Sequence, residues 1–137
     1  MAIPLNEDKD ERGQIAQFIR EFNGEGVQHI ALETSDIYFT VKQLIEQGIP
    51  FLRVPDKYYD TIDQRIDEHN EDINALQELG ILIDGGKEDG ILLQIFTEPI
   101  VGPVFFEIIQ RKGNKGFGHG NFKALFEAIE RDQLGLN

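Results

Sequence analysis

The sequence predicts a single α+β domain in which a strand and a helix are followed by a run of strands. Three observations favour this class. Apolar residues recur at helical spacing near both ends of the chain, a β-rich run at residues 27–33 precedes a helix that ends at glycine, and short β-rich runs follow between residues 81 and 110. The 137 residues suffice for one compact core. The expected element order is β-α-β-β-β with helical insertions.

The first half of the chain should contain two helices and two strands. Four apolar residues recur at helical spacing over residues 14–22, namely Ile15, Phe18, Ile19 and Phe22. Residues 27–33 read as a strand, and Thr34-Ser35-Asp36 then offers N-cap chemistry for a helix that ends at Gly48. Residues 50–54 are expected to return as a second strand.

The second half should contain two helical pieces, three strands and a closing helix. Residues 58–79 carry the helical pieces, with a polar and exposed break near His69. Residues 81–83, 91–97 and 104–110 read as strands separated by glycine- and proline-containing turns. Residues 121–131 form an amphipathic helix through Phe122, Leu125, Phe126 and Ile129.

These elements divide the chain into three expected parts. Residues 1–26 form a lead-in segment with a short helix, and residues 27–111 form the βαβββ module. Residues 112–137 form a glycine-rich hinge followed by the C-terminal helix.

Charge and composition narrow the class of partner. Lys and Arg number 13 against 25 Asp and Glu, so the formal net charge is -12, and such a surface repels phosphate backbones and anionic lipids. We therefore expect neither nucleic-acid nor membrane partners. No signal peptide or apolar stretch long enough to span a membrane is recognisable, which favours a cytoplasmic protein. The absence of cysteine leaves His, Asp and Glu as the side chains for any metal.

Strand alternation predicts one surface that could hold a metal. His29, Gln94 and Glu107 each lie in a different expected strand, and a sheet could bring the three to one concave face. An ionised carboxylate within the apolar run 104–109 costs several kcal/mol unless it is paired or bound to a metal. Imidazole plus carboxylate suits iron, zinc or manganese. A hydrogen-bonded core histidine and a surface glutamate are the alternatives to this interpretation.

The other histidines and the glycine cluster are assigned no ligand. His69 and His119 lie in polar settings and are expected to be exposed rather than to bind a metal. The glycines of residues 113–120 are not followed by the Lys-Ser/Thr of a phosphate-binding loop, so a flexible hinge is expected there.

Several stretches of the chain resemble 4-hydroxyphenylpyruvate dioxygenases, in the same order and over nearly the whole length. They are Pro-Leu-Asn-Glu at residues 4–7, Gly-Val-Gln-His-Ile-Ala-Leu at 26–32, Phe-Leu-Arg-Val-Pro at 51–55, Glu-Leu-Gly-Ile-Leu at 78–82, Leu-Leu-Gln-Ile-Phe-Thr at 92–97, Phe-Phe-Glu-Ile-Ile-Gln-Arg at 105–111, and Gly-Phe and Gly-Asn-Phe at 116–117 and 120–122. The resemblance implies the vicinal-oxygen-chelate fold, whose unit is a βαβββ module.

The resemblance also implies an Fe(II) centre held by two histidines and one glutamate. The second histidine falls on His29 and the glutamate on Glu107, whereas the first histidine belongs to an upstream module that this chain does not match. Neither His69 nor His119 takes its place. The chain alone is therefore expected to be inactive, and the site to be completed by the upstream module or by a second copy in a homodimer.

In such enzymes 4-hydroxyphenylpyruvate and O2 give homogentisate and CO2 in the breakdown of tyrosine and phenylalanine. No catalytic residue beyond the metal ligands is implied. Substrate contacts fall on Asn6, Gln14 and Gln94 as hydrogen-bonding residues, on Phe96 and Phe122 as stacking rings, and on Phe105, Phe117 and Asn121 as lining. The last helix resembles the family's gating helix. Gln28 is expected to face away from His29 by alternation and is left out of the site.

Two alternative functions stay open at this point. Hydroxymandelate synthase shares the fold, the iron and the substrate, but oxidises the benzylic carbon rather than the ring. A non-catalytic ligand-binding module of the same fold would need no metal.

Overall fold

A mixed four-stranded sheet is the framework of the computed structural model, which describes residues 1–121 and residue 124. The strand order is β1-β4-β3-β2, in which β1 runs parallel to β4 and the other neighbouring pairs are antiparallel. The strands are β1 (His29–Glu33), β2 (Leu82–Gly86), β3 (Gly90–Phe96) and β4 (Phe105–Lys112). The parallel β1–β4 pair requires a crossover, and the chain between the two strands supplies it with α2 and the helices that follow.

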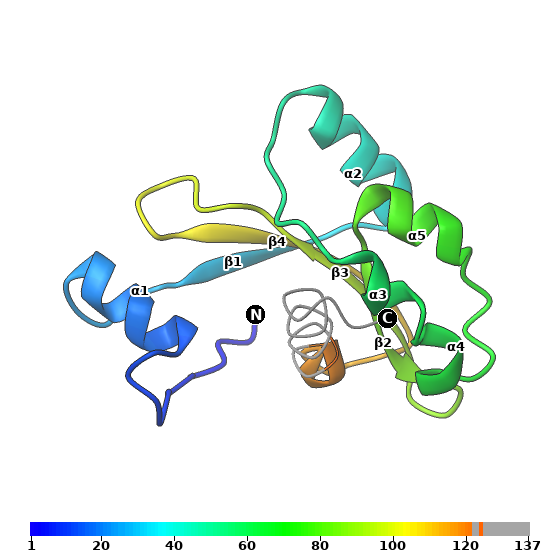
Figure 1. Cartoon of the computed structure of the whole chain (residues 1–137), viewed down its shortest axis with the longest axis horizontal. Helices are drawn as coiled ribbons and strands as arrows, with labels where there is room; N and C mark the ends of the chain where they lie inside the picture. The colour runs from blue at the N-terminus through cyan, green and yellow to red at the C-terminus, as the bar shows by residue number, and fades with distance from the viewer. Residues whose placement is uncertain (122–123, 125–137) are drawn as a thin grey trace.

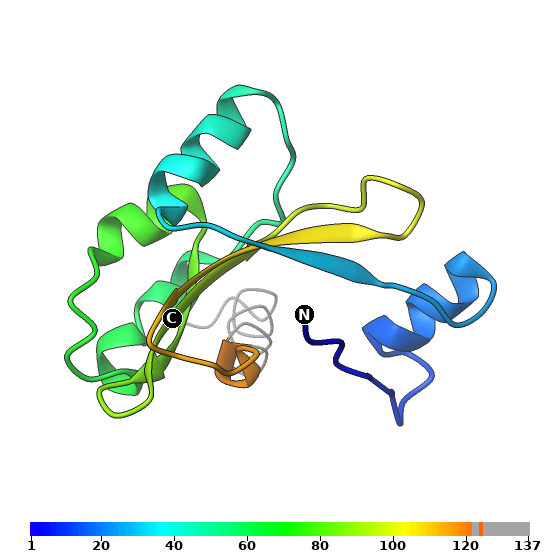
Figure 2. The same ribbon diagram turned by 180° about the vertical axis from the view of Figure 1, so that it is seen from behind.

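Helices cover one face of this sheet, as Figures 1 and 2 show from opposite sides. They are α2 (Ile37–Glu46), α3 (Asp56–Tyr59), α4 (Ile62–Arg65) and α5 (Ile73–Leu79). The remaining helix, α1 (Gln14–Phe22), lies beyond the start of β1 and apart from the others (Figure 1). The glycine-rich segment after β4 turns back on the opposite side of the sheet (Figure 2).

Short polar caps define where the two longest covering helices begin. The Asp36 carboxylate accepts a hydrogen bond from the Phe39 N–H at 3.0 Å, as expected for the N-cap of α2. Asp72 caps α5 in the same way through the N–H groups of Asn74 and Ala75. Gly80 ends α5 at φ 73°, a left-handed conformation that favours glycine.

The core lies between the sheet and these helices. Alternate residues of β2, β3 and β4 point toward the helical layer, and α2, α4 and α5 return apolar side chains to them. Burial of each large side chain stabilises the fold by roughly 1.5–3 kcal/mol. Members of this core that are at most 1% exposed include Ile37, Val41, Ile62, Leu76, Ile83, Leu93 and Ile95.

The expected α+β fold and its βαβββ order are confirmed, but one strand is wrong. Residues 50–54 make only the isolated bridge Phe51↔Thr97 beside the end of β3, where the Leu52 N–H donates to the Phe96 carbonyl at 2.9 Å. Pro50 has no N–H with which to continue a ladder, and Pro55 closes the segment at the start of α3.

Other details of the elements also differ from expectation. β1 begins at His29 rather than at residue 27, and β2 continues through Gly86, where a turn was expected. The expected break near His69 is present, but the helical piece before it is split into α3 and α4.

Within residues 1–121 and 124, the helices are too short and too polar for one to cross a bilayer. The expected amphipathic helix of residues 121–131 lies, apart from residues 121 and 124, outside the described residues.

Candidate functional site

The sheet face opposite the helices carries the candidate metal ligands. In the parallel register His29 pairs with Phe105 and Ala31 pairs with Glu107, so His29 and Glu107 share a face two positions apart along β4. Across the β3–β4 pair, Phe96 lies opposite Glu107. Gln94 lies two positions before Phe96 and therefore points to the same face.

His29 and Glu107 approach each other as alternation predicted. His29 Nε2 lies 3.5 Å from Glu107 Oε2, and the two side chains are 21% and 9% exposed. Two donors that each lie about 2.1 Å from one metal ion are roughly 3 Å apart at right angles and farther apart at wider angles. The separation of these two atoms is therefore compatible with two donors to one metal ion.

Aromatic rings enclose His29. The ring of Phe105 stacks on the imidazole with centroids 5.0 Å apart and planes at 11°. Phe96 meets the imidazole edge-on at 6.3 Å and meets Phe105 edge-on at 6.0 Å. The two phenyl rings leave the imidazole few ways to turn and lower the polarity around it.

Gln28 contacts His29, so the expectation that it faces away is wrong. Its side-chain Oε1 lies 3.3 Å from His29 Nδ1. The alternation argument failed because β1 begins only at His29, and Gln28 lies before the regular strand. A glutamine directly before a candidate ligand histidine is the sequence feature that could have indicated this contact.

A series of buried hydrogen bonds holds the side chain of Gln94 in place. Asn121 Nδ2 donates to Gln94 Oε1 at 3.1 Å, and Asn121 Oδ1 accepts a hydrogen bond from the Tyr58 hydroxyl at 2.6 Å. The Tyr58 oxygen in turn accepts from the Ile83 N–H on the outer edge of β2 at 2.9 Å. Gln94, Asn121 and Tyr58 are at most 2% exposed, so these bonds are shielded from water.

The remaining substrate-contact candidates stand apart from this cluster or outside the described residues. Asn6 and Gln14 are exposed, and within the described residues their side chains make no hydrogen bond to the sheet. Phe117 is 46% exposed on the loop after β4. Phe122 is not among the described residues. The roles of these four residues, like those of the other candidate site residues, stay predictions.

His69 is half-buried rather than exposed, which corrects the expectation for it. Its side chain is 8% exposed, Nε2 lies 3.0 Å from Asp63 Oδ1, and Nδ1 accepts the Glu71 N–H at 2.9 Å. Both ring nitrogens are therefore used to tie the irregular segment between α4 and α5. His119 is exposed, as expected.

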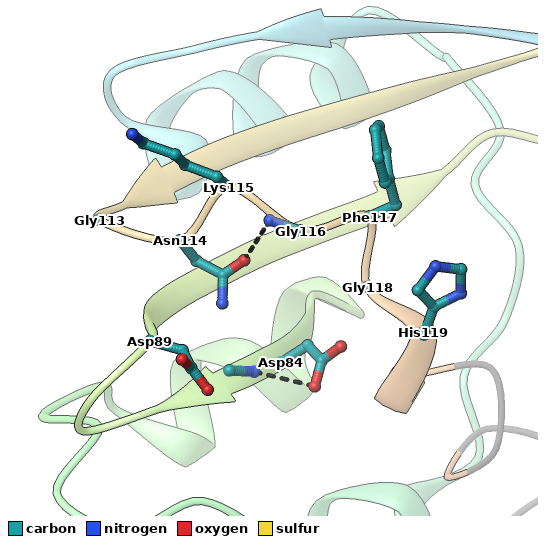
Figure 3. Close-up of a pocket in the computed structure, with 10 residues that line it drawn as sticks. Asp84, Asp89, Gly113, Asn114, Lys115, Gly116, Phe117, Gly118 and His119 are labelled. Atoms are coloured by element: carbon teal, nitrogen blue, oxygen red, sulfur yellow. Dashed lines mark hydrogen bonds between the residues drawn. The ribbon is translucent and has the colours of Figure 1, made fainter. Parts of the chain in front are cut away.

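The loop after β4 borders an open cavity of about 550 Å³ (Figure 3). Arg111 donates to the carbonyls of Asn114 and Gly116 at 3.1 and 2.7 Å, and the Asp84 carboxylate accepts the Gly120 N–H at 2.9 Å. His119 and Asp84 line the cavity, but His29 and Glu107 do not. Among the described residues, no set of three or more His, Asp and Glu side chains is grouped to hold a metal, and His29 and Glu107 are a pair of candidate ligands.

Comparisons with known proteins place this geometry in a family. Residues 1–68 match the family described as the Glyoxalase/Bleomycin resistance protein/Dioxygenase superfamily. The chain is similar to this superfamily over residues 1–68 and has its fold. The expected vicinal-oxygen-chelate fold is thereby confirmed.

Individual members of the superfamily align with nearly the whole chain. Hemolysin VllY of Vibrio vulnificus is 62% identical over 133 residues, and the 4-hydroxyphenylpyruvate dioxygenase of Pseudomonas aeruginosa is 59% identical over 133 residues. Each match covers 96% of this chain and 37% of the relative. A solved mutant of 4-hydroxymandelate synthase from Streptomyces coelicolor is 44% identical with a TM-score of 0.72, covering 88% of this chain and 34% of that one.

The chain thus spans just over a third of the length of these superfamily members. The resemblance to 4-hydroxyphenylpyruvate dioxygenases, and to their C-terminal portion, is confirmed.

Proposed function

We propose that this chain forms the C-terminal catalytic portion of an Fe(II) dioxygenase that converts 4-hydroxyphenylpyruvate and O2 to homogentisate and CO2 in tyrosine catabolism. The observation that carries the proposal is the 3.5 Å approach of His29 Nε2 to Glu107 Oε2 on the uncovered face of the sheet. The Pseudomonas aeruginosa and Legionella pneumophila relatives, both named 4-hydroxyphenylpyruvate dioxygenase, support the choice of substrate.

The donor set fits iron. One imidazole and one carboxylate on a face are ligands typical of non-haem Fe(II) sites, which add a second histidine and leave positions open for substrate and O2. When bound, the iron activates O2 toward the substrate. The described residues contribute two ligands, so the third would come from a module of the same fold or from a second copy of the chain.

The protein's own residues would bind and orient the substrate. Phe96 and Phe105 offer apolar rings next to the metal ligands, where an aromatic substrate can pack. Gln94 is held by Asn121 through Oε1, which leaves its Nε2 hydrogens to donate to a substrate oxygen. In this proposal Asn6, Gln14, Phe117, Asn121 and Phe122 complete the substrate site.

The position of β1 supports a partner that adds at this edge of the sheet. β1 is at one edge of the sheet, and Ile30 and Leu32 are 45% and 49% exposed. Unpaired strand edges with apolar side chains are sites where another chain or module can add. A homodimer or an adjoining module would meet this edge, and sedimentation of the purified chain distinguishes a dimer from a monomer.

Metal binding tests the proposal most directly. Isothermal titration with Co(II) as an iron surrogate should show one site in the wild-type chain, lost in Glu107→Gln and His29→Asn. The exposed histidine variant His119→Asn is the matched control and should keep the affinity of the wild type. Equal binding by wild type and Glu107→Gln would overturn the proposed centre.

The isolated chain should consume little or no O2 with 4-hydroxyphenylpyruvate, because its described residues supply only two ligands. Substantial turnover by the purified chain would contradict this expectation. Activity is therefore measured both on the chain and on a full-length relative that carries the Glu107→Gln change at the matching position.

A second candidate function is that of 4-hydroxymandelate synthase. The solved structure of a mutant of that enzyme from Streptomyces coelicolor is similar to this chain, which favours this candidate. Product analysis of the complete enzyme separates the two, because one yields homogentisate and the other 4-hydroxymandelate. A non-catalytic binding module would bind ligand without Co(II).

A cytoplasmic location, expected from the sequence, stays part of this proposal.

A further inference from the structure

The residue before His29 is held in place by the backbone of β4. The Gln28 carbonyl accepts a hydrogen bond from the Phe105 N–H at 3.1 Å, one step before the regular β1–β4 ladder begins. This bond fixes the backbone from which the Gln28 side chain extends. The half-buried side chain turns back toward the imidazole, with Oε1 3.3 Å from His29 Nδ1.

This contact selects one tautomer of His29. A carboxamide oxygen only accepts hydrogen bonds, so with Gln28 Oε1 turned toward the ring this contact is a hydrogen bond when Nδ1 carries the hydrogen. A neutral imidazole carries one N–H, and Nε2 then presents its lone pair. Nε2 is the atom that lies 3.5 Å from Glu107 Oε2, beyond the usual N–H···O range of about 2.7–3.2 Å. Two electron-pair donors that converge in this way call for a cation between them.

Phe105 restricts the same ring in a second way. Its phenyl group lies directly across the ladder from His29 and stacks on the imidazole within 11° of parallel. A partial turn of the imidazole about its Cβ–Cγ bond would lose this stacking, and a half turn would move Nδ1 away from Gln28. The hydrogen bond and the stacking therefore hold one and the same ring orientation.

We propose that Gln28 is a positioning residue for the metal centre, because its side-chain oxygen keeps the hydrogen on Nδ1 of His29 and leaves Nε2 free to bind the metal ion. The inference rests on the proposed function, since it needs His29 as a ligand. Groups that orient a ligand histidine through its second nitrogen typically change metal affinity by about 10- to 100-fold when they are removed.

Three variants test this role. Gln28→Leu keeps the approximate size of the side chain and removes the acceptor, so Co(II) affinity should fall by about 10- to 100-fold. Gln28→Glu keeps an acceptor for Nδ1–H and should retain wild-type affinity or exceed it. Gln64→Leu makes the same change at an exposed position of α4 and should have no effect.

A second measurement does not depend on metal. In the metal-free chain, long-range ¹H–¹⁵N spectra of His29 report which ring nitrogen is protonated. The wild type and Gln28→Glu should show the hydrogen on Nδ1, and Gln28→Leu should shift the population toward the Nε2–H form.

The outcomes separate the two proposals. Equal Co(II) affinity of the wild type and Gln28→Leu, or a His29 tautomer that Gln28→Leu leaves unchanged, would overturn the role of Gln28 alone. Failure of the wild type to bind Co(II) through His29 would overturn the proposed function, and the metal-positioning role of Gln28 with it. Loss of affinity in Gln28→Leu that Gln28→Glu restores supports the inference.

Discussion

The Tyr58 hydroxyl donates a hydrogen bond to Asn121 Oδ1 over 2.6 Å, and this bond joins the helical layer to the face that carries the candidate site. Tyr58 lies in α3. Its hydroxyl contacts Ile83 of β2, the outer strand of the sheet, as well as Asn121. Asn121 passes the connection on to Gln94 of β3. Because the helical layer supplies this anchor, the orientation of Gln94 depends on residues far from the candidate metal ligands in sequence.

Tyr58→Phe should therefore destabilise the fold by about 1–3 kcal/mol, because it leaves the Ile83 N–H and the Asn121 carboxamide without their partner. Tyr59→Phe is the matched control. The Tyr59 hydroxyl is buried and has no hydrogen-bond partner among the described residues, so its removal should leave the free energy of unfolding unchanged or raise it slightly. Urea denaturation measures both variants. Equal losses in the two variants would contradict the specific role of the Tyr58 hydroxyl.

The buried tyrosines should also make the chain sensitive to alkaline pH. Burial raises the pKa of Tyr59, and burial raises the pKa of Tyr58, partly offset by the nearby Arg65 charge. An unfolded tyrosine loses its proton near pH 10 while the folded side chain keeps it, so this contribution to stability is complete below about pH 10 and falls as the pH rises toward the folded-state pKa.

Urea denaturation between about pH 8 and pH 10.5 tests this expectation. The free energy of unfolding should decline at the upper end, and the decline should be smaller in Tyr59→Phe, which has lost one of these groups. An identical decline in the two proteins would show that Tyr59 does not contribute.

Glu107→Gln should separate stability from metal binding. Glu107 is 7% exposed in a strand of apolar residues, and its charge faces the His29 ring at 3.5 Å. Without a metal, the loss of this buried charge should leave the free energy of unfolding unchanged or raise it by up to about 1 kcal/mol. Thermal unfolding in the presence of a chelator measures the difference. A clear loss of stability would indicate that Glu107 is structural.

Gly118→Ala should disturb the loop that leads to Asn121. Gly118 has φ 75°, and an added Cβ would lie 1.9 Å from Gln94 Oε1, so both backbone strain and a clash arise. We expect a loss of about 2–4 kcal/mol in the free energy of unfolding. Gly48→Ala is the control, since Gly48 has φ 85° but no atom within 4 Å of the added Cβ, and it should cost about 1 kcal/mol. Equal costs would show that the contact with Gln94 adds nothing.

The sequence alone determined the local features of this protein. Backbone alternation determines which residues of one strand share a face, so Gln94 was expected on the face of Phe96 and Glu107 on the face of Phe105. The N-cap of α2 at Asp36 is likewise a local feature, because its hydrogen bond spans only a few residues.

Only the tertiary structure decided how these local features meet. The expected strand at residues 50–54 reduces to one bridge, and His69 is held by contacts with Asp63 and Glu71. The contact of Gln28 with His29 depends on where β1 begins, and the Tyr58–Asn121 bond joins residues 63 positions apart. Alternation and capping act over a few residues of backbone, whereas the distance between two side chains in separate elements depends on the register and packing of the whole sheet.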